Sequence, residues 1–268
     1  MAYLERDAGK RIYFEDYGSG VSAVVLVHGW GMSVRTWDFN LNAIRAAGHR
    51  VVLIDHRGCG LSDKDFSDFS IEAIAGDVIA LVDHLNLAQV VLNGWSLGGA
   101  VVIQAASELG ARCAGVVNTC GATPAYLQKS DYPYGGEKAA LAETMAAMEA
   151  NRAEFLWGLT QGIAAKPLGD NTLHWIWQIF MESCPSAAAS LAALGPLDQR
   201  AILAELSCPI LSCVGTEDVV VDPDIPRSVT NINTNARTHE FAGCGHAPHI
   251  EDAAAYNQLL IDFISECI

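Results

Sequence analysis

The sequence lacks several features that would place its function at a membrane or on a nucleic acid. No window reaches about 18 uninterrupted apolar residues, so we expect no membrane span. The start of the chain has no basic segment followed by an apolar one, so we expect no secretory signal. Basic residues are few, with 16 Lys and Arg against 31 Asp and Glu and a net charge of −15. This charge argues against nucleic acid and anionic membranes as partners, and mildly against strongly anionic substrates.

The sequence also lacks cysteine and histidine patterns of the kind that hold metals. Its eight cysteines form no C-x-x-C pair and no His/Cys spacing typical of a metal site. Four of them, at positions 113, 120, 208 and 213, lie in or beside apolar runs. We interpret them as free, buried thiols in a reducing compartment, and we expect a cytoplasmic protein that needs no metal or organic cofactor. The oligomeric state stays open.

Short apolar runs alternate with helical patterns through most of the chain, of which 51% is apolar. This order is typical of an α/β protein with a mostly parallel sheet covered by helices on both faces. Strands are expected over 11–17, 24–27, 51–54, 90–93, 114–118, 209–215 and 238–241. Helices are expected over 37–47, 70–85, from about 97 to 110, and over 251–264. Ser70 is expected to cap the second helix, with Asp77 on its outer face.

Between residues 122 and 206 the strand pattern disappears, and Ala, Met and aromatic residues dominate. We predict a helical cap over 122–206, inserted into a core formed by 1–121 and 207–268. Trp157 and Trp177 of the cap, with Trp30 and Trp95 of the core, are predicted substrate contacts. The alternative, equally weighted for any one cap aromatic residue, is that it packs the cap's own core.

The segment from Gly94 to Gly98, Gly-Trp-Ser-Leu-Gly, is the strongest motif. It follows a buried apolar run and opens a helical one, so Ser96 is expected at a sharp turn between strand and helix. Such a turn lifts a hydroxyl to the sheet edge, at a helix N-terminus, where it can act as a nucleophile. Small glycines suit the strained backbone beside it. The alternative is that Ser96 only caps the helix.

A serine nucleophile needs a base, and the base needs an orienting acid. Because active groups gather at the carboxyl ends of parallel strands, we place the acid at Asp218 and the base at His246. The resulting order Ser, Asp, His is the order that this turn predicts. Glu217 and Asp222 remain alternative acids. His249 is an alternative base, although its place at the start of the last helix favours a solvated or capping role; His28 is expected to shape its own loop.

Acyl transfer also requires donors for a developing oxyanion. The N–H of Leu97 follows the nucleophile directly. The N–H of Trp30, in the loop His28-Gly29-Trp30-Gly31 after an early strand, is the second candidate.

These motifs resemble those of the α/β-hydrolase superfamily over nearly the whole chain outside the cap. The turn from Asp55 to Ser62 is also similar to a structural turn of that family. The resemblance implies a sheet of about eight strands. The His28 loop and the Ser96 turn look like those of pimeloyl-ester methylesterases, serine perhydrolases and lactonases. Residues 125–200 carry five Lys or Arg against eight Asp or Glu, which disfavours the acidic carrier-protein substrate of the biotin pathway.

The resemblance implies a serine hydrolase that cleaves a small apolar carboxylic ester or lactone through an acyl-enzyme. Ser96 excludes the dehalogenases and epoxide hydrolases of this fold, which use an aspartate. The carbon–carbon hydrolases of the family usually have a Ser-Gly-Pro-Gly type loop where this chain has Trp30-Gly31, so we consider that reaction less well supported. Perhydrolysis, a lyase reaction at the same triad, and a small-ligand receptor with little turnover are the alternatives.

Overall fold

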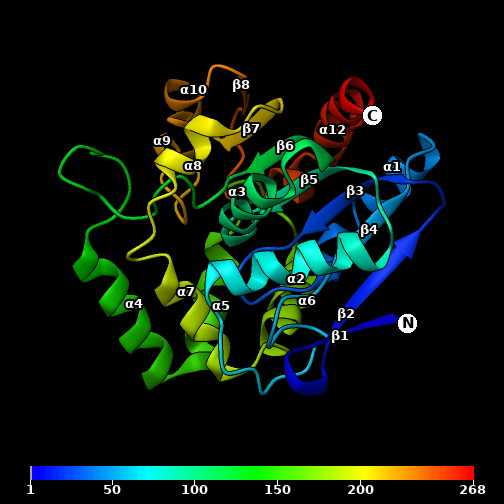
Figure 1. The fold of residues 1–268 in the computed structure, drawn as a ribbon. Coiled ribbons are helices and arrows are strands. Elements are labelled where there is room, and N and C mark those ends of the chain that lie inside the picture. The colour runs from blue at the N-terminus through cyan, green and yellow to red at the C-terminus, as the bar shows by residue number, and fades with distance from the viewer. Residues whose placement is uncertain (1) are drawn as a thin grey trace.

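The computed structural model describes residues 2–268, so Met1, the first residue of the predicted core, lies outside the described residues. Its centre is one eight-stranded sheet with the order β1-β2-β4-β3-β5-β6-β7-β8 (Figure 1). Strands β3 to β8 pair in parallel, and β1 and β2 join the edge by antiparallel pairing. The strand bounds are β1 (Ala2–Arg6), β2 (Lys10–Tyr17), β3 (Ser22–Val27), β4 (Val51–Ile54), β5 (Gln89–Trp95), β6 (Cys113–Thr119), β7 (Ile210–Gly215) and β8 (Ala236–Phe241). The predicted mostly parallel sheet of about eight strands is confirmed.

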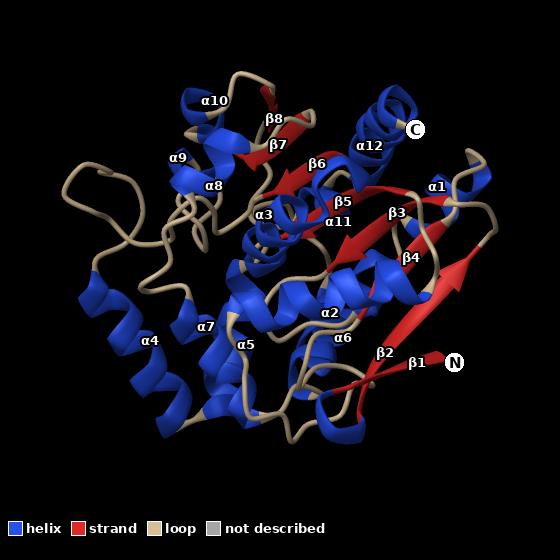
Figure 2. Ribbon diagram, in the orientation of Figure 1, coloured by secondary structure: helices blue, strands red, loops and turns tan. Residues whose placement is uncertain are grey.

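Helices cover both faces of this sheet (Figure 2). One layer contains α1 (Leu41–Ala46) and α12 (Ala253–Cys267), which contact each other. The other contains α2 (Ile71–His84), α3 (Leu97–Leu109) and α8 (Arg200–Glu205), with α3 between the other two. Two short helices, α9 (Asp224–Arg227) and α10 (Val229–Ile232), lie between β7 and β8, and a third, α11 (Pro248–Glu251), follows β8.

Four further helices lie together to one side of the sheet, between β6 and α8: α4 (Lys138–Ala150), α5 (Arg152–Gly162), α6 (Asp170–Met181) and α7 (Ala188–Ala193) (Figure 2). They fall inside the predicted cap, and no sheet strand of the described chain lies between β6 and β7. The division of the chain at residues 122 and 206 stays a prediction.

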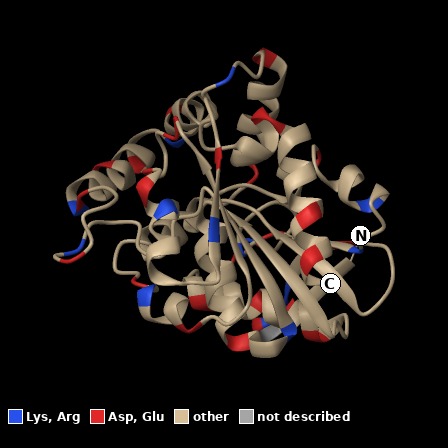
Figure 3. Ribbon diagram, turned by 90° about the horizontal axis from the view of Figure 1, so that it is seen from above, with Lys and Arg blue, Asp and Glu red and all other residues tan. Residues whose placement is uncertain are grey.

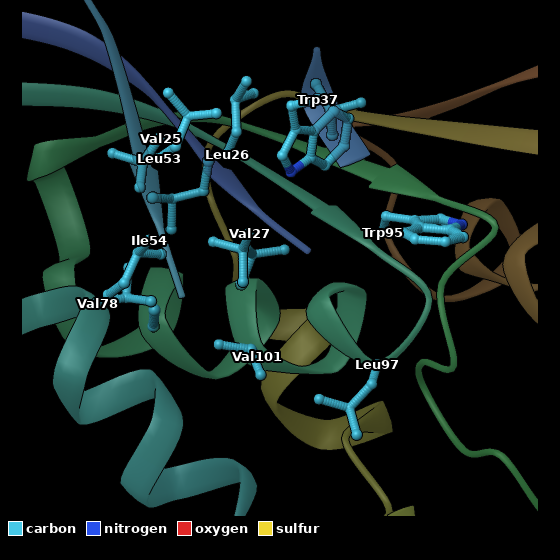
Figure 4. Close-up of a cluster of buried hydrophobic side chains, with 14 of the residues drawn as sticks. Val25, Leu26, Val27, Trp37, Leu53, Ile54, Val78, Trp95, Leu97 and Val101 are labelled. Atoms are coloured by element: carbon cyan, nitrogen blue, oxygen red, sulfur yellow. The ribbon is translucent and has the colours of Figure 1, made fainter. Parts of the chain in front are cut away.

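The central strands are apolar over their whole length because helices cover both of their faces. All four residues of β4 are buried, as are the last five of β3. Figure 4 shows this core, in which Val27, Ile54 and Val78 lie near Val101 of α3. The core therefore supports β5 and α3, the two elements that meet at Ser96.

Four local predictions need correction. The helix predicted over 37–47 is a single 3₁₀ turn, Val34–Trp37, followed by the short α1. Asn40 precedes α1 but its side chain does not cap the helix; it donates to the His249 carbonyl and to Asn257. The closing helix begins at Ala253, after a break at Asp252, and β1 was not predicted.

Asp77 is the fourth correction. It is buried rather than outward-facing, because Arg57 and Arg6 both pair with its carboxylate, at 2.6 and 2.9 Å. The predicted cap of α2 is present, since the Ser70 hydroxyl accepts from the N–H of Ala73. None of the helices in the described part of the chain combines the length and apolarity needed to cross a bilayer.

Candidate active site

Ser96 lies at the turn between β5 and α3, with φ 58° and ψ −121°. This positive φ is rare for a residue with a side chain, and the surrounding packing must hold it. A Cβ on Gly94 would lie 2.1 Å from the Gly98 carbonyl oxygen, and one on Gly98 would lie 2.5 Å from the Val27 carbonyl oxygen. The two glycines are thus required because strand, turn and helix backbones touch here, and this contact presents the Ser96 hydroxyl at the sheet edge.

His246 and Asp218 form a buried pair at the same edge. The His246 Nδ1 lies 2.7 Å from Asp218 Oδ2. The other oxygen, Oδ1, accepts the N–H groups of Val220 and Val221 at 2.8 and 3.0 Å. Both carboxylate oxygens are therefore satisfied, and one of them orients the imidazole.

The alternative acids do not face the imidazole. Glu217 is exposed, and Asp222 accepts the N–H groups of Gly135 and Asp224. Of the three carboxylates considered from the sequence, the structure brings Asp218 to His246.

The loop that carries His246 is fixed by its backbone. The N–H of His246 donates to the Ile163 carbonyl at 2.9 Å, and its carbonyl accepts from the Trp95 indole at 2.8 Å. The Glu251 carboxylate then accepts four backbone N–H groups, two from the loop (Gly245, Ala247) and two from the segment after α5 (Ala165, Lys166). Sequence reasoning missed Glu251, and a carboxylate five residues after the base was the available signal.

Ser96 and His246 line the same cavity. Within residues 2–268 the Ser96 side chain makes no hydrogen bond, to His246 or to any other residue. Bonds between nucleophile and base are often long in free sites and shorten when substrate binds. The Ser96 hydroxyl and the imidazole that Asp218 orients thus face the same cavity, and the hydrogen bond between them is expected to form when substrate binds.

Two backbone N–H groups are available near Ser96. A Cβ on Gly29 would lie 3.2 Å from the Ser96 Cβ, so the loop that carries Trp30 passes directly beside the nucleophile. The N–H of Leu97 is the first of α3, where helix amides lack intrahelical acceptors. In the described part of the chain, the N–H groups of Trp30 and Leu97 donate to no backbone carbonyl. These are the two donors expected from the sequence, and their role in binding an oxyanion stays a prediction.

A cavity of about 350 Å³ opens above Ser96. Trp30 and Trp95 line it, and their contact with a substrate stays a prediction. Its remaining walls come mainly from the segment between β6 and β7, which includes α5, α6 and α7, and from the loop after β7: Phe155, Leu159, Ile163, Phe180, Leu191, Leu194, Val219, Val220 and Val221. Among the residues that line it, the polar side chains are the hydroxyls of Ser96, Tyr126 and Thr144, the imidazole of His246 and the indoles of Trp30 and Trp95.

Trp157 and Trp177 do not line this cavity, so their predicted role as substrate contacts needs correction. Trp157 stacks on His174 with ring centroids 5.4 Å apart and meets Trp177 edge-on. The Trp177 indole donates to the Ala153 carbonyl at 3.3 Å. Both residues hold α5 to α6, and the neighbouring Phe155 reaches the cavity instead.

His249 is fully buried, contrary to the solvated or capping role expected for it. Its ring packs between Trp37 and Trp95, and neither ring nitrogen has a hydrogen-bond partner. Burial, with a smaller effect of His246, lowers the pKa of His249 to about 3. His249 is therefore neutral and does not reach the cavity. His28 shapes its loop as expected, since its Nε2 accepts the N–H of His56.

Among residues 2–268, one group of side chains could offer metal ligands. Cys120, Asp218 and His246 bring their ligand atoms within 4.8 Å of one another. Asp218 and His246 already bond to each other, and burial raises the pKa of the Cys120 thiol well above its usual value. A thiol that stays protonated is a poor ligand, so this set fits a hydrogen-bonded pair better than a metal centre.

The comparison with protein families decides the classification. The model of the alpha/beta hydrolase family matches residues 24–259. The chain belongs to this family. The resemblance seen in the sequence motifs is thereby confirmed.

Two relatives illustrate the range of this alpha/beta hydrolase's similarities. An AB hydrolase superfamily protein of Bacillus subtilis (strain 168) is 26% identical over 263 residues, covering 97% of this chain and 98% of the relative. A bifunctional esterase/perhydrolase of Acinetobacter calcoaceticus is 25% identical over 274 residues, covering 98% and 99%. Other relatives carry the names of a pimeloyl-carrier-protein methyl ester esterase and of non-heme haloperoxidases.

Solved structures agree on the fold. An esterase from Exiguobacterium antarcticum superposes with a TM-score of 0.94 at 23% identity, covering 98% of each chain. A bromoperoxidase from Bacillus anthracis gives 0.93 at 27% identity, covering 98% of this chain and 99% of the other. The sheet, its helices and the segment between β6 and β7 thus share one architecture with these proteins.

Proposed function

We propose that this alpha/beta hydrolase is a serine hydrolase that cleaves a small, apolar carboxylic ester or lactone. The hydrogen bond between Asp218 and His246, beside Ser96 on one cavity wall, carries this proposal. It supplies the base and its orienting acid at the place where the β5–α3 turn presents a hydroxyl.

In the proposed mechanism, Ser96 Oγ attacks the carbonyl carbon while His246 takes its proton. The N–H groups of Trp30 and Leu97 stabilise the oxyanion. His246 then protonates the leaving alcohol, and the acyl-enzyme forms. A water molecule, deprotonated by His246, releases the acid and regenerates Ser96. Asp218 holds the imidazole with its proton on Nδ1 throughout both steps.

The cavity walls support the substrate class. They are formed mainly by aliphatic and aromatic side chains, and among the described lining residues there is no Lys, Arg, Asp or Glu. A charged group would lose its hydration there without gaining a partner of opposite charge. Asp and Glu outnumber Lys and Arg by 31 to 16, and they are spread over the fold (Figure 3). This excess also argues against a substrate that is attached to an acidic carrier protein.

Perhydrolysis is the second candidate, favoured by the similarity to the bifunctional esterase/perhydrolase. It uses the same acyl-enzyme, with hydrogen peroxide in place of water as the attacking group. The ratio of peracid to acid formed from one ester separates the two reactions.

Replacement of Ser96 by Ala tests the proposal. We expect the wild-type protein to turn over p-nitrophenyl butyrate many times, and S96A to lose roughly 10⁴–10⁶ of kcat/KM. Ser107, an exposed serine of α3, provides the matched control S107A, which should retain full activity. A fluorophosphonate probe should label wild type and S107A but not S96A. Slow single turnover by wild type, with a ligand-dependent rise in melting temperature, would instead favour the receptor alternative.

A further inference from the structure

Tyr126 stands between the catalytic cavity and a neighbouring pocket. It follows β6 by seven residues and lines the cavity above Ser96. It also lines an adjoining pocket of about 290 Å³, together with Asp218 and Asp222. Val219 and Val220 are shared between the two in the same way. Tyr126 is therefore on the wall of both the catalytic cavity and the pocket next to it.

The hydroxyl of Tyr126 is unpaired among the residues that the structure describes. Within residues 2–268 it makes no hydrogen bond, whereas the hydroxyl of nearby Tyr132 pairs with Ser228 at 3.0 Å. It is also absent from the fully buried unpaired polar atoms of the described chain, so the oxygen keeps some accessible surface. A half-buried, unpaired hydroxyl on a cavity wall can donate to a bound molecule without breaking an existing bond.

The neighbouring carboxylate does not need this donor. Both oxygens of Asp218 are occupied, by His246 and by the N–H groups of Val220 and Val221. Burial and the negative charge of Asp218 both raise the pKa of Tyr126, so the hydroxyl keeps its proton at neutral pH. The same negative charge disfavours an anionic group beside Tyr126.

We propose that Tyr126 is a specificity-determining residue whose hydroxyl donates a hydrogen bond to an uncharged oxygen of the substrate, an ether, hydroxyl or carbonyl outside the reacting ester group. This inference rests on the proposed ester hydrolysis at Ser96. It narrows the substrate class from apolar esters in general to apolar esters or lactones that carry a second, neutral oxygen acceptor.

Pairs of esters that differ in one CH₂-to-oxygen exchange provide the test. One set scans an ether oxygen through the acyl chain of p-nitrophenyl hexanoate, and the other scans it through the alcohol of hexyl butyrate. For each pair, the ratio of kcat/KM for the oxygen-containing ester to that for its carbon analogue is measured in wild type and Y126F. Intrinsic reactivity cancels between the two proteins, and a general loss of active enzyme lowers both members of a pair equally.

We expect the ratio to fall roughly 3- to 10-fold in Y126F at one or two oxygen positions, and to stay unchanged at the others. Tyr134 packs edge-on against Tyr132 and does not line the cavity, so Y134F is the matched control and should change no ratio. Ratios that are equal in wild type and Y126F at every position would overturn the inference, as would faster hydrolysis of a carboxylate-bearing ester than of its neutral analogue. Absence of ester turnover in wild type would instead count against the proposed function itself.

Discussion

The Asp218 carboxylate determines which ring nitrogen of His246 carries the proton. One oxygen accepts two backbone N–H groups and the other faces His246 Nδ1. Since a carboxylate only accepts hydrogen bonds, the proton of the neutral imidazole must lie on Nδ1. The Nε2 lone pair is then free to take the proton of a nucleophile, which is the state that a general base requires.

The variant D218N should reverse this state. The amide oxygen would continue to accept from Val220 and Val221, which turns the NH₂ group toward His246 and forces the proton to Nε2. We expect kcat to fall by roughly 10³–10⁴ with little change in folding. The control is D222N, because Asp222 bonds backbone N–H groups and not the imidazole. A D218N enzyme within a few-fold of wild type, measured with p-nitrophenyl butyrate, would contradict the assigned role.

The β5–α3 turn shows how an element imposes a conformation that its own residues do not prefer. Ser96 holds a positive φ because Gly94 and Gly98 let three stretches of backbone meet. In contrast, Gly76 lies within α2 with ordinary room, since a Cβ there would meet only the Arg6 Nη2, at 3.7 Å. The fold therefore requires glycine at position 94 of β5, whereas α2 has room for a side chain at position 76.

The same substitution should thus have opposite effects at the two positions. We expect G94A to lower the free energy of unfolding by about 3 kcal/mol, because backbone and the Val102 side chain block the new methyl group. We expect G76A to raise it by about 0.5–1 kcal/mol, because alanine restricts the unfolded chain and favours a helix. Urea unfolding measures both. Equal stabilities for G94A and wild type would show that the turn is not as tightly packed as described.

The regular elements were predictable because their periodicity reflects burial. Continuous apolar runs identified β3, β4, β5 and β7, whose two faces are both covered. Strand β1 lies at the sheet edge with one buried residue, Leu4, and so carries no such pattern. The Asn40 side chain, just before α1, bonds to residues more than 200 positions away instead of capping the helix, and the local sequence does not contain these contacts.

The positions of the three candidate catalytic residues could be predicted from the sequence, whereas most residues of the cavity walls could not. Ser96, Asp218 and His246 follow strand ends, so their proximity derives from topology. The cavity walls depend on which helix face turns inward. Phe155 reaches the cavity whereas Trp157, two residues later, packs on His174. Composition alone could not separate them, because both faces of α5 carry aromatic side chains.

At the scale of the whole molecule, three buried histidines link stability to pH. Burial lowers the pKa of His28 and of His249 to about 3, and that of His56 well below its ordinary value. In the unfolded chain each titrates near 6.5. Between about pH 3 and 6.5 the unfolded chain therefore binds more protons than the folded one, so stability is full above pH 6.5 and falls as the pH drops.

Replacement of His249 by Phe isolates the contribution of one of these three histidines. Its ring nitrogens have no partners, so H249F loses no hydrogen bond and should be close to wild type in stability at pH 8. Between pH 8 and pH 5 we expect the variant to lose about 2 kcal/mol less free energy of unfolding than wild type. Urea titrations at the two pH values measure this difference. Identical losses in both proteins would show that His249 is protonated in the folded state.

Glu251 holds the His246 loop and the segment after α5 with one carboxylate. Its carboxylate holds the backbone of the His246 loop and also that of residues 165 and 166, which lead from α5 toward α6. Because one carboxylate holds both segments at once, a motion of residues 165 and 166 away from the sheet either breaks these hydrogen bonds or pulls on the backbone of the His246 loop. A change at residues 165 and 166 that admits a bulkier ester therefore also disturbs the position of the His246 imidazole.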